Sequence, residues 1–183
     1  MIEFTPIHTT DKDYPFIENL LHTSFPENER RDDEGQRYNT DHNPLFTCYL
    51  ITDGDTKVGL FTLWSLNGFH YAEHLATSPE VRNRGYGRLI MEKVTEIIPD
   101  TLVLEVEEPN DEMSIRRIGF YQRCGLRLCD KSYMQPPYRK GDQGLPLKLM
   151  FYGTENIDGH FDSIRDNIHK EVYGVTDNTK SQE

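Results

Sequence analysis

The segment 69–107 constrains the fold of this chain more than any other part of the sequence. It begins with a β-rich run at 69–77 and continues through a turn that contains Gly85 and Gly87. A helix follows, in which apolar residues recur at helical spacing until Pro99 ends it, and a second β-rich run occupies 101–107. A strand, a helix and a strand at this spacing predict a right-handed parallel crossover.

The flanking runs predict a mixed, mostly antiparallel sheet. Short glycine turns separate β-rich runs at 45–52, 57–66 and 69–77, which predicts an antiparallel meander. Further strands are predicted at 2–8, 126–129 and 145–152, and further helices from about 10 to 25, from Asp111 or Ser114 to Arg123, and at 157–172. The charged segment 27–43 is predicted to be a mobile helix–loop region. A long loop rich in Pro, Gly and Tyr precedes the last strand, and loops of that length usually have a function.

Length and composition set the domain organisation. The chain has 183 residues, of which 36% are hydrophobic, enough for a single domain with a real core. We expect that domain to span 1–153. An amphipathic helix within 154–175 carries a narrow apolar stripe that must pack on the domain or on a partner, so the protein is expected to be a monomer or a homodimer. The polar residues 176–183 are expected to form a disordered tail.

The net charge of −11 disfavours nucleic-acid binding, because an acidic surface repels phosphate. Apolar stretches are too short to cross a membrane and Met1 is not followed by a signal peptide pattern, so we expect a cytoplasmic protein. The three cysteines, Cys48, Cys124 and Cys129, are expected to be buried small hydrophobic residues, and no metal is expected.

Positive charge gathers in the turn at 82–88, which we call the glycine turn. Between Arg82 and Lys93 there are four basic residues and one acidic residue. The glycines let a ligand approach the backbone, and the free N–H groups at the start of the following helix favour an anion. The pattern is neither the Rossmann fingerprint nor a Walker loop. The turn therefore predicts a pyrophosphate site.

The stretch 75–89, LATSPEVRNRGYGRL, resembles the RxxGxG segment of the GNAT superfamily of N-acetyltransferases, and 118–126, IGFYQRCGL, is similar to that family's FYxxxGF segment. The resemblance spans 1 to about 152 and implies an α+β GNAT fold with helices on both faces of the sheet. It also implies acetyl-CoA as co-substrate and an amine acceptor, either a small molecule or a peptide. Many members have Asn where this chain has Ser114. The residues implied to bind the cofactor are Leu75, Ala76, Thr77, Arg82, Asn83, Arg84, Gly85, Tyr86, Gly87, Arg88, Ser114 and Tyr121.

The same resemblance suggests the catalytic roles. Glu73, expected to share a strand face with Tyr71 and Leu75, is predicted to be the general base, and Tyr121 the general acid that protonates the departing thiolate. A backbone N–H of Leu75 or Ala76 is predicted to stabilise the oxyanion, so the amine attacks the thioester directly. Segments 27–41 and 131–144 are expected to line the acceptor side.

Two alternatives remain open at this point. The fold can serve as a non-catalytic acyl-CoA-binding or sensor module, and the donor can carry a longer acyl chain than acetyl. A zinc site is a weaker alternative, because His70, Glu73 and His74 match HxxEH by letter. On a strand, however, Glu73 is expected to face away from both histidines.

Overall fold

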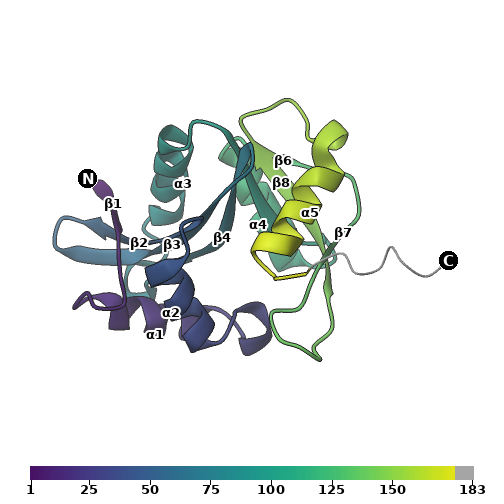
Figure 1. Cartoon of the computed structure of the whole chain (residues 1–183). Coiled ribbons are helices and arrows are strands. Elements are labelled where there is room, and N and C mark those ends of the chain that lie inside the picture. The colour runs from purple at the N-terminus through teal and green to yellow at the C-terminus, as the bar shows by residue number, and fades with distance from the viewer. Residues whose placement is uncertain (176–183) are drawn as a thin grey trace.

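The computed structural model describes residues 1–175, so the predicted tail at 176–183 lies outside the described residues. An eight-stranded sheet forms its centre, in the order β1-β2-β3-β4-β5-β8-β6, with β7 paired to β8 (Figure 1). The strands are β1 Ile2–Pro6, β2 Phe46–Asp53, β3 Thr56–Leu66, β4 Phe69–Thr77, β5 Thr101–Glu107, β6 Arg127–Leu128, β7 Tyr133–Gln135 and β8 Leu145–Tyr152. The helices are α1 Tyr14–Ser24, α2 Asp33–His42, α3 Tyr86–Ile97, α4 Glu112–Arg123 and α5 Phe161–Glu171, with short 3-10 turns at Glu27–Glu29, Pro79–Val81 and Asp158–His160.

The predicted crossover is confirmed. Strand β4 pairs with β5 in parallel, α3 connects them, and the other neighbouring strands of the described sheet are antiparallel. The parallel pairing covers only four residue pairs, Phe69–Ala72 with Thr101–Leu104, after which the two strands diverge. The mixed α+β fold is therefore as predicted, with an opening between its two central strands.

A β-bulge in β4 changes which residues share a face. Thr62 lies opposite His74 while Leu63 lies opposite Ala72, so Glu73 is the extra residue. A bulge re-aims the side chains that follow it. The expectation that Glu73 and Leu75 share a face is therefore wrong: Glu73 contacts Trp64 on one face, whereas Leu75 packs in the core of the other.

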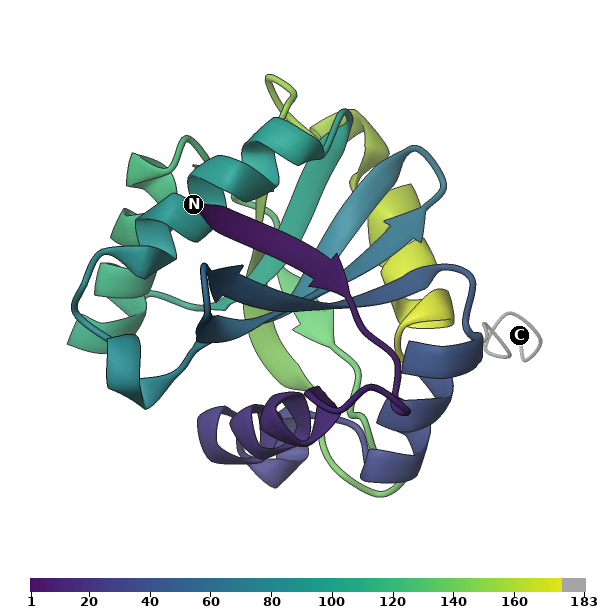
Figure 2. The same ribbon diagram turned by 90° about the vertical axis from the view of Figure 1, so that its left-hand side faces the viewer.

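Helices cover both faces of the sheet (Figure 2). The first core cluster joins one face to α1 and α5 through Ile17, Leu20, Phe161, Ile164 and Ile168, together with Ile157 and Val172 beside α5. The second core cluster joins the other face to α3 and α4 through Ile90, Met91, Val94 and Ile118. The apolar stripe of the C-terminal helix is thus buried against its own domain in this structure.

Two segments differ from the sequence interpretation. The charged segment 27–43, predicted to be mobile, contains the helix α2, whose N-cap Asp32 accepts a hydrogen bond from Gly35 N at 2.7 Å. Strand β7 lies within the predicted long loop. Cys48 and Cys129 are buried as expected, but Cys124 is only half-buried.

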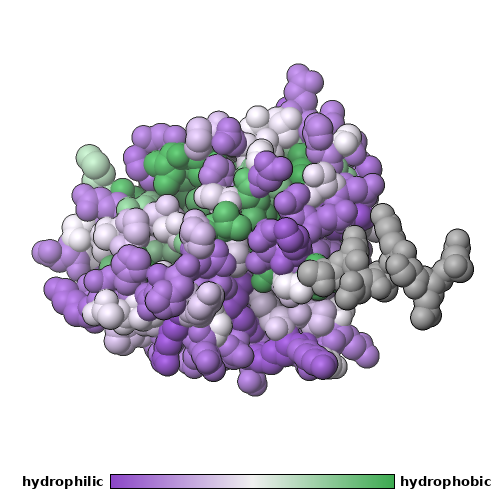
Figure 3. Space-filling view, in the orientation of Figure 1, coloured by the Kyte–Doolittle hydropathy of each residue, from purple (hydrophilic) through white to green (hydrophobic). Residues whose placement is uncertain are grey.

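The outer surface agrees with the acidic, polar composition. In the view of Figure 3 it is mainly hydrophilic, with smaller hydrophobic areas in the upper half around α3. Within residues 1–175, none of the helices combines the length and the apolar character that a membrane span requires.

Candidate active site

A cavity of about 510 Å³ opens where β4 and β5 diverge. Leu75, Ala76 and Thr77 line it from β4, and Glu105, Val106 and Glu107 line it from β5. Further lining residues are Arg82, Arg117, Tyr121, Gln135 and Tyr138, with Glu73 and His74 at the bulge. The cavity therefore brings together residues from the glycine turn, from α4 and from the 131–144 loop.

The glycine turn leads from the cavity into α3. Gly85 at the helix N-cap has φ +80°, a conformation that favours glycine, and it offers no side chain to cap the helix. The first N–H groups of α3 consequently have no side-chain cap. Tyr86 anchors the turn because its hydroxyl donates to Asp53 at 3.0 Å. These features suit the predicted anion site.

The predicted cofactor residues fall into three groups. Leu75, Ala76, Thr77, Arg82 and Tyr121 line the cavity. Asn83, Arg84, Gly85, Tyr86, Gly87 and Arg88 form the adjacent glycine turn and the start of α3. Ser114 stands apart, because its buried hydroxyl is used in the cap of α4, where it donates to the Asp111 carbonyl at 3.0 Å and accepts from Asp111 N at 3.2 Å.

Tyr121 projects from α4 toward the cavity. Its ring packs edge-on against Phe120 with centroids 5.3 Å apart. Burial raises the pKa of its phenol above the usual value, so the hydroxyl carries its proton at neutral pH. Such a phenol is able to donate a proton to an anion that forms beside it.

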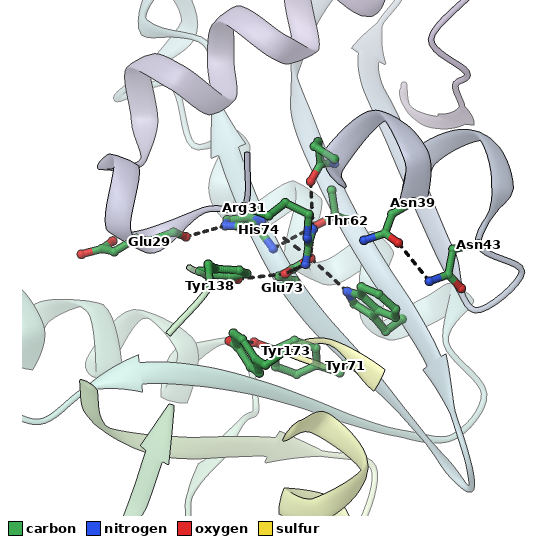
Figure 4. Close-up of polar contacts among 12 residues, drawn as sticks. Glu29, Arg31, Asn39, Asn43, Thr62, Tyr71, Glu73, His74, Tyr138 and Tyr173 are labelled. Carbon is green, nitrogen blue, oxygen red and sulfur yellow. Dashed lines mark hydrogen bonds and ion pairs between the residues drawn. The ribbon is translucent and has the colours of Figure 1, made fainter. Parts of the chain in front are cut away.

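The carboxylate of Glu73 has no exposed surface and is held by several donors (Figure 4). Arg31 contacts both oxygens, with Nη2 on Oε1 and Nη1 at 3.1 Å from Oε2. Trp64 Nε1 donates to Oε2 at 2.9 Å and the Tyr138 hydroxyl donates to Oε1 at 2.8 Å. Burial alone would raise the pKa of Glu73, but Arg31, with a smaller contribution from His74, lowers it below the usual value.

Arg31 is itself enclosed. Its side chain is 9% exposed, and its guanidinium lies 5.7, 5.6 and 5.3 Å from the ring centres of Phe46, Trp64 and Tyr138. Its Nη1 also donates to Gln36 at 2.9 Å. Burial would lower the pKa of Arg31, but Glu73 raises it, so both members of the pair are ionised.

Glu105 is a second acidic residue at the site, and sequence reasoning missed it. It projects from β5, lines the cavity, and accepts hydrogen bonds from Tyr133 OH at 2.5 Å, Gln135 Nε2 at 2.5 Å and Tyr173 OH at 2.8 Å. Burial raises the pKa of its carboxyl group, although the hydrogen bonds lower it in part. The available signal was a glutamate between Leu104 and Val106, two buried apolar residues of the strand.

The HxxEH segment, residues 70–74, lies on strand β4. Its two histidines are therefore not one helical turn apart on the same face, as a zinc site of this type requires. His74 nevertheless lies beside Glu73, with Nδ1 at 3.8 Å from Oε2, so the expectation that Glu73 faces away from both histidines is wrong for His74. The bulge is the reason. His74 Nε2 donates to the Glu29 carbonyl at 3.0 Å. In residues 1–175 no group of three or more His, Cys, Asp or Glu side chains is arranged to hold a metal ion.

Comparisons with known proteins agree with this architecture. A putative acetyltransferase of the GNAT family from Bacteroides thetaiotaomicron is 44% identical, with a TM-score of 0.93 over 95% of this chain and 99% of that one. NAA60 from Arabidopsis thaliana, solved with acetyl-CoA, is similar in fold, with 17% identity and a TM-score of 0.63 over 85% of this chain and 100% of that one.

A curated relative is the peptidyl-lysine N-acetyltransferase YjaB of Salmonella typhimurium, which is 29% identical over 107 residues. That match covers 58% of this chain and spans only 62% of the length of the relative. The acetyltransferase (GNAT) family model matches residues 14–126, which include β4, the glycine turn, α3 and Tyr121. The chain therefore belongs to the acetyltransferase (GNAT) family.

Proposed function

We propose that this protein is an N-acetyltransferase that moves the acetyl group of acetyl-CoA to a primary amine. The observation that carries the proposal is the cavity between β4 and β5, which brings Arg82 of the glycine turn together with Tyr121 and with the carboxylates of Glu73 and Glu105. An anion-binding turn, a proton donor and an enclosed space are the features that acyl transfer from a thioester to an amine requires.

The cofactor is proposed to bind along the glycine turn. Its pyrophosphate would accept hydrogen bonds from the first N–H groups of α3, with Arg82, Arg84 and Arg88 supplying positive charge. Arg88 Nε already donates a hydrogen bond to Glu92 at 2.7 Å. Arg82, which lines the cavity, is therefore the stronger candidate for a contact with the pyrophosphate. Ser114 as a cofactor contact stays a prediction, and its use in the α4 cap leaves its hydroxyl few free hydrogen-bonding positions.

In the proposed reaction the amine attacks the thioester carbonyl directly. A backbone N–H of Leu75 or Ala76 would stabilise the oxyanion, since both residues line the cavity from β4. Tyr121 would protonate the departing thiolate, a role that its raised pKa supports. No covalent intermediate on the protein is needed.

The predicted role of Glu73 as general base stays a prediction, and its contacts weigh against it. Both carboxylate oxygens already accept hydrogen bonds from two donors each, one of them a cation, and the lowered pKa makes the carboxylate a weak proton acceptor. These contacts support a structural role, in which the Arg31–Glu73 pair fixes the bulge and the segment between α1 and α2.

Two measurements test the proposal. Calorimetric affinity for coenzyme A should fall in Gly87→Glu and Arg82→Ala but not in Arg165→Ala, which removes a partly exposed arginine of α5 that is paired with aspartates. Unchanged affinity in both turn variants would contradict the cofactor site.

Thiol release from acetyl-CoA, screened with polyamines, amino acids and peptides, tests transfer of the acetyl group. Binding without turnover for any amine would favour the non-catalytic sensor alternative.

A further inference from the structure

The two buried carboxylates at the cavity differ in how their charge is compensated. Glu73 forms an ion pair with Arg31. Glu105 accepts hydrogen bonds from the neutral groups of Tyr133, Gln135 and Tyr173, with a smaller contribution from Tyr71, and it has no ion pair within the part of the chain that the structure describes. A carboxylate removed from water without a cation is costly, so a protein that retains one at a cavity wall leaves a place for a cationic ligand.

Three donors hold the Glu105 carboxylate, and we call Tyr133, Gln135 and Tyr173 the Glu105 cage. Tyr133 and Gln135 come from β7, and Tyr173 follows α5 at the end of the described chain. All three lie beyond residue 126, where the family match ends. The cage is therefore built by parts of this chain outside the matched region.

Tyr173 reaches the site because α5 is packed firmly on the sheet. The apolar residues of α5 and Val172 are buried in the first core cluster. The Tyr173 hydroxyl donates to Glu105. It also lies 3.3 Å from the hydroxyl of Tyr71, and the Tyr173 ring centre lies 4.9 Å from that of Tyr138 (Figure 4). The C-terminal segment thus connects the Glu105 side of the cavity to the Tyr138 and Glu73 side.

We propose that Glu105 binds the acceptor amine as an ammonium ion and accepts the first proton that this ion loses, an inference that rests on the proposed function. Tyr173 is then a positioning residue for the Glu105 carboxylate. The acceptor class is accordingly a primary amine that is protonated in solution. Glu105 and Tyr121 line the same cavity, so one bound acceptor is able to reach both the proton acceptor and the thioester.

The ammonium transfers one proton to Glu105, and the neutral amine nitrogen forms a bond to the thioester carbonyl carbon. The carbon–sulfur bond then breaks, and Tyr121 gives its phenolic proton to the thiolate. The second proton on the new amide nitrogen restores Tyr121 through water, and Glu105 releases its proton to solvent. One proton is released overall for each acetyl group transferred.

Glu29 and Glu107 also line the cavity, and burial raises the pKa of Glu29, but the phenols that surround Glu105 are not acidic. The phenols of Tyr71, Tyr133, Tyr138 and Tyr173 have pKa values raised chiefly by burial, so they stay neutral near pH 7. On α5, His169 packs against the Tyr133 ring with centroids 5.5 Å apart. Glu73 is balanced by Arg31. Glu105, with a raised pKa, is the better proton acceptor of the two carboxylates.

The test uses the full chain with Glu105→Gln and Tyr173→Phe. Matched controls are Glu96→Gln, which removes an exposed carboxylate of α3, and Tyr38→Phe, which removes an exposed hydroxyl of α2. Glu105→Gln should lower kcat/KM for the amine by roughly 10²–10⁴-fold and abolish the acidic limb of its pH profile, while coenzyme A affinity is unchanged. The controls should match the wild type.

Tyr173→Phe should lower kcat/KM less, by about tenfold, and should move the acidic limb to higher pH. The sign follows because a donor to the charged carboxylate lowers its pKa, so removing that donor raises the pKa. A structural loss alone would reduce the rate without moving the limb. Glu105→Gln activity within about threefold of the wild type, with an unchanged limb, would overturn the proposal while leaving the proposed acetyl transfer intact.

A binding readout covers the case in which no amine in the panel is acetylated. Spermidine, lysine amide and a peptide with a free N-terminus are each titrated into the coenzyme A complex while Tm is recorded. Stabilisation of the wild type that is lost in Glu105→Gln would support the ammonium site even though acetyl transfer had failed. Equal stabilisation of both proteins, or none of the wild type, would overturn it.

Discussion

Removing Arg31 should destabilise the protein far more than removing a surface charge. In Arg31→Met the Glu73 carboxylate, which has no exposed surface, keeps the hydrogen bonds from Trp64 and Tyr138 but loses the arginine with which it forms an ion pair. Breaking a buried pair from one side costs about 3–5 kcal/mol, because the remaining charge is left buried. A typical domain has a free energy of unfolding of about 5–15 kcal/mol, so this loss is a large fraction of the total.

Urea unfolding at pH 7, followed by circular dichroism, measures this loss. The double variant Arg31→Met with Glu73→Gln should lose less than the sum of the two single variants, since no unpaired charge remains in it. Arg165→Ala, at a partly exposed arginine, is the control and should change the free energy of unfolding by less than about 1 kcal/mol. A loss below about 1 kcal/mol in Arg31→Met, or strict additivity in the double variant, would contradict a strongly coupled, ionised Arg31–Glu73 pair.

The same pair gives stability a dependence on pH. Because the folded pKa of Glu73 is lowered, its contribution is fully present above the unfolded pKa of about 4.3 and is lost as the pH falls through the folded value. The difference in free energy of unfolding between the wild type and Glu73→Gln should therefore be largest near neutral pH and shrink in acid. A difference that stays constant down to about pH 2 would mean that folding does not shift the pKa of Glu73, and a difference that grows in acid would mean that the folded pKa is raised.

Three further changes test other parts of the structure. Tyr121→Phe should lower kcat by roughly 10²–10⁴-fold with little change in KM for acetyl-CoA, and a variant within about twofold of the wild type would show that Tyr121 only packs. Gly59→Ala should cost more than about 2 kcal/mol, because the new Cβ would lie 2.1 Å from the Ala76 carbonyl oxygen, whereas Gly159→Ala, which meets nothing within 4 Å, should be nearly neutral in the same thermal scan. Truncation after Gly153 removes the apolar stripe of α5 and should cause aggregation or a marked fall in Tm; a soluble, equally heat-resistant product would contradict the packing described for α5.

The elements that sequence predicted well are those whose pattern is local. The run 101–107 matches β5 to the residue, because its apolar residues lie between Pro99 and the Glu-Glu-Pro of 107–109. The glycine turn was found for the same reason, since the residues that shape it are consecutive. The helix α2 was not recognised as an ordered helix because its two buried residues, Gln36 and Thr40, are polar and leave no apolar period.

The side chains that contact Glu73 and Glu105 could not be predicted from the sequence. Arg31 is 42 residues from Glu73, and Tyr173 is 68 residues from Glu105. Nothing local signals either contact. The bulge at Glu73 also defeats simple alternation, because one inserted residue reverses the faces of all those after it. A pattern of alternate residues therefore placed Leu75 beside Glu73 and His74 away from it, and both placements are wrong.

The separation of β4 from β5 also has a consequence for internal motion. Beyond Ala72 and Leu104, each strand is hydrogen-bonded along one side and faces the cavity with the other. Two halves of the sheet, β1–β4 and β5–β8, are thus joined edge to edge by only four residue pairs. Local opening is easiest where backbone hydrogen bonds are few. Amide hydrogens at 74–77 and 105–107 that face the cavity should exchange with solvent faster than those of β3, and a ligand that bridges the two strands should slow them, so that binding also stiffens the sheet.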